Sequence, residues 1–110
     1  MMKNASYYRE IKNSRVYYNN ILEKFEDALD KAVYDHAYDM FANGPVIYEE
    51  YLKDIETPDG SVEYLVSTYN IIMDDIINIL KKKLTALGYN SIKIDYKNNN
   101  KPAIRIEFDY

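Results

Sequence analysis

The chain has 110 residues, of which 47% are apolar, and it carries 14 Lys and Arg against 18 Asp and Glu, a net charge of −4. This length and apolar content predict a single domain over residues 1–110 with a real core, and they exclude a disordered tail. The absence of cysteine excludes disulfides, thiol catalysis and cysteine-ligated zinc. No apolar run approaches the ~20 residues of a membrane span, and we expect no signal peptide and no membrane partner.

A long helix is predicted from about Ser6 to Ala42, where neither Gly nor Pro occurs. Apolar residues recur there at steps of three, four or seven, which is typical of one helical face. That stripe consists of Ile11, Tyr18, Leu22, Phe25, Leu29, Val33, His36 and Met40. One helix of this length would measure roughly 55 Å, more than a compact domain of this size. We therefore expect it to bend at Asn19–Asn20, or to project and pair with another chain.

Two further helices are predicted after Asn43-Gly44-Pro45, which combines a helix stop with a helix start. The first is short, from about Pro45 to Asp54, and a turn at residues 57–60 follows it. The second runs from about Val62 to Leu87 and is broadly apolar, with Gly88 as its C-terminal signal. We expect Ile72, Ile76 and Leu80 from this helix to meet Phe25 and Leu29 in the core. Ile94 and Ile106 should complete the same core.

The C-terminal part of the chain changes to alternation of apolar and charged residues, with strands at residues 92–97 and 104–110. This pattern predicts a β-hairpin with one apolar face, which must pack on the helices because two strands alone are marginal. The fold class is therefore α+β: one long N-terminal, one short and one long buried helix, followed by a C-terminal hairpin. We expect the terminal strand, Ala103–Tyr110, to leave an open sheet edge.

Charge is segregated along the chain, with a net +3 over residues 1–20, −8 over 21–60, −3 over 61–80 and +4 over 81–110. Carboxylates at helical spacing form an acidic face on the first helix, and the 13 tyrosines are too many for one core face. Exposed tyrosine is enriched at interfaces. The predicted partner-binding residues are Glu23, Glu26, Asp27, Asp30, Tyr34, Glu49, Glu50 and Asp54.

No catalytic motif is present, and we expect no catalytic, cofactor-binding or metal-binding residue. His36, the only histidine, lies on the apolar stripe and fits a structural role at the edge of the core. Asp74 and Asp75 are adjacent on a helix, so they point about 100° apart and do not form a carboxylate dyad. An enzyme is accordingly the least expected class.

Two alternatives to a protein-binding acidic face remain open. Lys81–Lys83, Lys93, Lys97, Lys101 and Arg105 could form a basic patch around the hairpin. Such a patch would suit a small winged-helix-like nucleic-acid-binding protein, although residues 61–80 are acidic and would repel phosphate. The long helix could instead build an oligomeric structural subunit. The helix and the open sheet edge both favour a homodimer.

Residues 33–40 read VYDHAYDM and resemble the stretch FDHAYEM found early in Ocr-type phage antirestriction proteins, which mimic DNA. In both, an acidic segment follows, although this chain is less acidic and ends in a basic hairpin. The resemblance implies a non-enzymatic inhibitor that presents carboxylates where an enzyme expects phosphates. Our leading hypothesis is thus a phage or mobile-element, anti-defence protein. It would act in the cytoplasm of a bacterial host and bind a host protein with a basic, nucleic-acid-binding surface.

Overall fold

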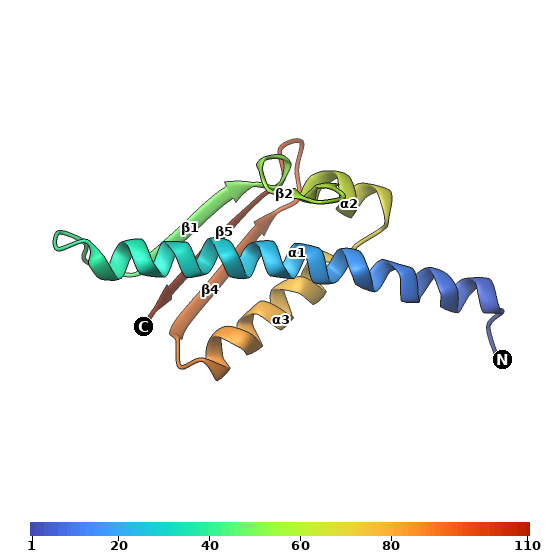
Figure 1. Ribbon diagram of the computed structural model, residues 1–110, viewed down its shortest axis with the longest axis horizontal. Helices are drawn as coiled ribbons and strands as arrows, with labels where there is room; N and C mark the ends of the chain where they lie inside the picture. The colour runs from blue at the N-terminus through green and yellow to red at the C-terminus, as the bar shows by residue number, and fades with distance from the viewer.

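The computed structural model describes all residues, Met1–Tyr110, and confirms the α+β class (Figure 1). Three α-helices, one 3₁₀ turn and two small sheets follow one another along the chain. In order, they are α1 (Ala5–Tyr38), β1 (Val46–Tyr51), η1 (Leu52–Asp54), β2 (Glu56–Thr57), β3 (Gly60–Ser61), α2 (Val62–Thr68), α3 (Met73–Ala86), β4 (Asn90–Lys97) and β5 (Ala103–Asp109).

The main sheet has three antiparallel strands in the order β1-β5-β4. The predicted hairpin of β4 and β5 is confirmed, with Ile94 opposite Ile106. The expected open edge at Ala103–Tyr110 is wrong, because β5 lies in the centre of the sheet and β1 covers that side, with Val46 opposite Phe108. The edges of the sheet are therefore β1 and β4.

The helix expected from Pro45 to Asp54 is also wrong, because most of this segment is strand β1. Its burial alternates along Val46–Tyr51, as in a strand with one face on the core. The apolar residues of this stretch also fit a helical spacing, which is what misleads the sequence-based prediction. Val46-Ile47-Tyr48, however, are β-branched and aromatic residues that favour a strand, and β5 supplies the hydrogen-bonding partner.

The third predicted helix is divided into α2 and α3 by a break at residues 69–72. Asn70 adopts a left-handed conformation, with φ of 52°. The N–H of Ile72 donates to the hydroxyl of Tyr18 at 2.9 Å, which fixes the start of α3 against α1. As a result Ile71 is buried while Ile72 is exposed, so Ile72 is not the core residue that the apolar stripe predicts.

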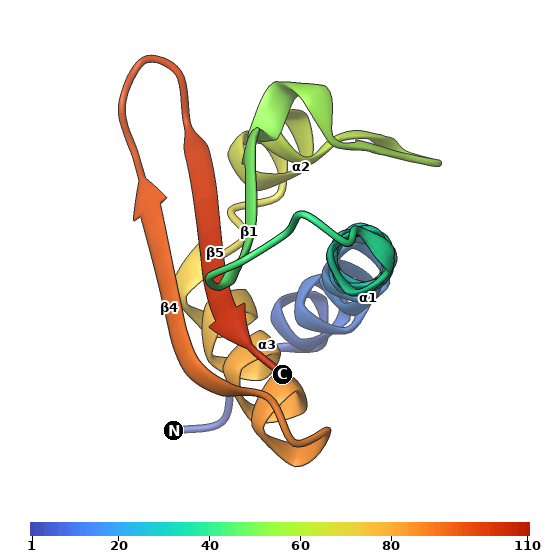
Figure 2. The same cartoon turned by 90° about the vertical axis from the view of Figure 1, so that its left-hand side faces the viewer.

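The core lies between the sheet and the two long helices, which sit on the same side of it (Figure 2). Phe25 and Leu29 from α1 share this core with Ile76 and Leu80 from α3, as predicted. The inner face of β5 contributes Ile104, Ile106 and Phe108, and Ile94 of β4 is partly buried. At the end of α3, Gly88 has φ of 94° and the Tyr89 N–H donates to the Leu84 carbonyl, a glycine C-cap as predicted.

Helix α1 runs through Asn19–Asn20 as one continuous helix and projects beyond the rest of the chain (Figure 1). Its 34 residues correspond to roughly 51 Å, and the longest dimension of the molecule is 56 Å. No residue before Ile21 is buried. Of the two predicted arrangements, the structure therefore shows projection. We refer to residues 5–16, the outer part of this projection, as the arm.

Candidate protein-binding surface

Three predicted site residues, Glu23, Asp27 and Asp30, form an acidic strip along the outer side of α1. They lie within about 60° of one another around the helix axis, and all three are exposed. None of them forms an ion pair with a cation of this chain. The fourth predicted carboxylate, Glu26, is half-buried and pairs with Lys83 of α3 at 2.5 Å. The strip therefore presents three negative charges that the chain does not neutralise.

An apolar tip adjoins the acidic strip at the C-terminal end of α1. The predicted Tyr34 is exposed, and its ring lies 4.6 Å from that of Tyr38. Just beyond the helix, Met40 and Phe41 are each 86% exposed. The Phe41 N–H donates to the Asp39 carboxylate at 2.9 Å, which holds the turn that carries them. Large apolar side chains gathered at one exposed end are typical of an interaction site.

Met40 and Phe41 are the part of this surface that sequence reasoning missed. The 3–4 spacing assigns Met40 to the buried stripe of the first helix, but α1 ends at Tyr38 and the chain turns away from the core. The available signal was Asn43-Gly44-Pro45, which places the helix stop only a few residues later.

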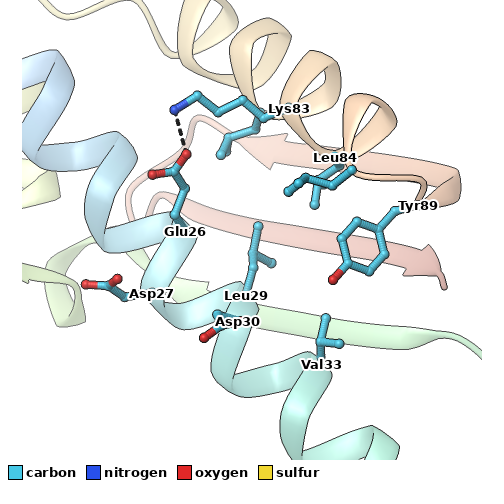
Figure 3. A pocket seen from close by; sticks show the side chains of 10 residues that line it. Glu26, Asp27, Leu29, Asp30, Val33, Lys83, Leu84 and Tyr89 are labelled. Atoms are coloured by element: carbon cyan, nitrogen blue, oxygen red, sulfur yellow. Dashed lines mark hydrogen bonds and ion pairs between the residues drawn. The ribbon is translucent and has the colours of Figure 1, made fainter.

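A groove between α1 and α3 borders the same helix (Figure 3). Leu29 and Val33 point from α1 toward Leu84 and Tyr89 on the opposite wall. The cavity encloses about 310 Å³, and its rim carries the carboxylates of α1. The ion pair between Glu26 and Lys83 joins the two walls at one end of the groove. A second cavity follows on the N-terminal side of this pair, between residues 15–22 of α1 and residues 75–82 of α3.

The other predicted carboxylates, Glu49, Glu50 and Asp54, do not join the acidic strip. Because β1 is a strand, the adjacent Glu49 and Glu50 point to opposite faces of the sheet. Glu49 lies 4.0 Å from Arg105, and Asp54 is in η1. Lys97 and Lys101 line the same cavity as Glu49 and Glu50, so these acids sit in a mixed-charge environment.

His36 has both ring nitrogens engaged. Because the Gly44 carbonyl can only accept, Nε2 carries the proton and donates to it at 3.1 Å. The Nδ1 atom then accepts from the Tyr110 hydroxyl at 2.8 Å. The histidine thus ties α1 to the loop before β1 and to the C-terminal residue, which is the structural role that its position on the apolar stripe indicates.

The cations of the predicted basic patch are partly neutralised. Glu107 pairs with Arg105 at 3.2 Å and with Lys93 at 3.7 Å on the outer face of the sheet. Lys97 and Lys101 form no ion pair. Lys83 is also paired, with Glu26. The part of the predicted patch without ion pairs therefore consists of the hairpin loop and Lys81 and Lys82 of α3.

Nowhere in the chain do three His, Asp or Glu side chains gather in a way that could hold a metal ion. None of the helices combines the length and apolar character needed to cross a bilayer. No protein-family model, curated protein or solved structure matches the chain.

Proposed function

We propose that this chain is a non-enzymatic interaction protein, a phage or mobile-element inhibitor that covers a basic, nucleic-acid-binding surface of a host defence protein. The observation that carries the proposal is the acidic strip of Glu23, Asp27 and Asp30, exposed and free of cation partners beside the apolar tip. The nature of the host protein rests on the resemblance of residues 33–40 to Ocr-type proteins.

The strip and the tip would contribute in different ways. Along the helix axis the carboxylates are separated by roughly 6 and 4.5 Å, so they offer a row of negative charge to a surface that attracts phosphates. Such long-range attraction speeds encounter and weakens as salt screens it. Tyr34, Tyr38, Met40 and Phe41 supply the apolar area that hot spots of protein interfaces require. Blocking by occupancy needs no turnover.

The test is capture of proteins from a nuclease-treated bacterial lysate on the immobilised chain, followed by elution with duplex DNA. We expect the wild type to retain nucleic-acid-binding proteins that the DNA releases, because both compete for one basic surface. The variant Glu23→Lys/Asp27→Lys/Asp30→Lys should retain none of them. The matched control Glu49→Lys/Asp54→Lys/Glu56→Lys changes the net charge equally but lies outside the strip, and it should behave like the wild type.

Undiminished, DNA-sensitive capture by the strip variant, with a native circular dichroism spectrum, would contradict the proposal. A second candidate function, direct nucleic-acid binding, is favoured by the exposed, unpaired Lys97 and Lys101 of the hairpin loop. It predicts that the wild type binds duplex DNA at physiological salt and that Lys97→Glu/Lys101→Glu abolishes this binding.

A further inference from the structure

We infer that two copies of this chain pair through antiparallel α1 helices, with the arm of each copy lying in the groove between α1 and α3 of the other. The inference goes beyond the proposed function, because the occupant of the groove is the protein itself.

The arm carries an apolar face that the rest of the chain leaves exposed, although Glu10, Asn13 and Ser14 border a cavity together with residues 68–70. Tyr7 and Ile11 are about half exposed, and they lie on the same side of α1 as Tyr18 and the core residue Phe25. A short helical segment whose apolar face is exposed is marginal in water, because helix stability normally comes from burying such a face. The arm therefore has a face that needs covering.

The groove is the complementary surface. Its floor is apolar, and Leu87, which lines it near the C-terminal end of α3, is 75% exposed. The groove follows α1 from Glu26 to Val33, a rise of roughly 10 Å, and a separate, more polar cavity lies beyond the Glu26–Lys83 pair. Tyr7 and Ile11 of the arm are separated by only about 6 Å along the helix axis. The groove is thus long enough to receive the part of the arm that carries these two apolar residues.

Charge selects a second copy as the occupant. Residues 1–20 carry +3, from Lys3, Arg9, Lys12 and Arg15 against Glu10. The groove rim carries Asp27 and Asp30 without cation partners, whereas its third carboxylate, Glu26, is neutralised by Lys83. Two arms packed against each other would place cations against cations. An arm in the groove of the second copy places cations against carboxylates instead.

A two-fold axis near Asn19–Asn20 lets both copies form the same arm–groove contact at once. It brings Arg9 and Lys12 of each arm alongside Asp27 and Asp30 of the other copy, with Arg15 near Glu23. In such an interface the same surface of each chain contacts the other reciprocally. In this arrangement the apolar face of each arm turns toward α3 of the second copy, where Leu84 and Leu87 lie. Asn20 donates to Asp59 of its own chain, but Asn19 is exposed at the centre, and a polar asparagine there is a known means of setting the register of paired helices.

The experiment is sedimentation equilibrium of the full chain, with charge reversal on either side of the interface. The wild type should give twice the 13.0 kDa chain mass. The arm variant Arg9→Glu/Lys12→Glu and the groove variant Asp27→Lys/Asp30→Lys should each dissociate at least about tenfold more readily, because each then repels itself. All four positions are exposed, so the fold should survive, as circular dichroism can verify. The control Lys97→Glu/Lys101→Glu should remain dimeric.

Mixing the arm and groove variants should restore a dimer containing one copy of each, because both arm–groove contacts again join opposite charges. A monomeric wild type would overturn the inference. So would folded arm and groove variants that stay dimeric separately, or that fail to associate when mixed.

The outcome is separable from the proposed function. The arm variant keeps the acidic strip, so it should still capture basic proteins whether or not the wild type dimerises. Asp27 and Asp30 serve both contacts, however, so a basic partner would compete with the arm of the second copy.

Discussion

His36 joins three parts of the molecule through two hydrogen bonds, to the Gly44 carbonyl and the Tyr110 hydroxyl. Because neutral hydrogen bonds each contribute about 1 kcal/mol net, His36→Ala should lower the free energy of unfolding by roughly 1–2 kcal/mol. Phe25→Ala, which empties a fully buried site, should cost about 3–5 kcal/mol. Thermal melts of both variants, beside the capture assay, provide the check. A His36→Ala variant that kept its melting temperature but lost capture would show a functional role for this residue.

The ionisation of Tyr48 makes the free energy of unfolding depend on pH in the alkaline range. Its burial, together with the nearby charge of Glu50, raises the pKa of Tyr48 from 10.0 to about 12. The folded chain therefore holds this proton at pH values where the unfolded chain has lost it, so the contribution is intact below pH 10 and is lost as pH rises toward 12. The free energy of unfolding, measured with urea, should fall less between pH 9 and pH 11.5 for Tyr48→Phe than for the wild type. For Tyr34→Phe, at an exposed position, the free energy of unfolding should fall as much as for the wild type. An equal fall for all three chains would contradict this account.

At the scale of elements, the break between α2 and α3 depends on the left-handed Asn70. A non-glycine residue in this conformation costs roughly 1–2 kcal/mol, and asparagine tolerates it better than alanine. Asn70→Ala should therefore destabilise the chain by about 1 kcal/mol, whereas Asn70→Gly should be neutral or slightly stabilising. In a continuous helix the order would be reversed, because alanine is the best helix former and glycine a poor one. Urea midpoints of the two variants decide between these arrangements.

Elements whose pattern is determined locally could be predicted from the sequence. Helix α1 and the hairpin of β4 and β5 show long, unbroken periodicity, and the predicted acidic strip depends only on helical spacing. Strand β1 could not be recognised in this way, since its identity depends on pairing with β5, more than 50 residues away. That error also placed Glu49 and Asp54 on a helical face that does not exist. The break before α3 likewise depends on a distant contact, between Ile72 and Tyr18.

Considered as a whole, the molecule is 56 Å long and 24–29 Å across, because α1 projects beyond the core. The projecting N-terminal end of α1 is basic, and the C-terminal half, which packs on the core, is acidic. One helix therefore carries both signs of charge on exposed faces. In the two proposals, the strip would bind a basic partner and the arm would bind a second copy. Together these contacts would account for the segregation of charge along a helix that is longer than its own core requires.

The central claim is that the acidic strip of α1 is the binding surface. The most direct measurement is the dissociation constant of a captured, DNA-eluted host protein for the wild type, the strip variant and its matched control at one salt concentration. We predict that Glu23→Lys/Asp27→Lys/Asp30→Lys weakens binding by about a hundredfold or more, since close charge pairs across interfaces contribute several kcal/mol in total. Glu49→Lys/Asp54→Lys/Glu56→Lys should change it by less than about threefold, as charges outside an interface do. Equal weakening by the two variants would contradict the claim and leave only net charge as the determinant.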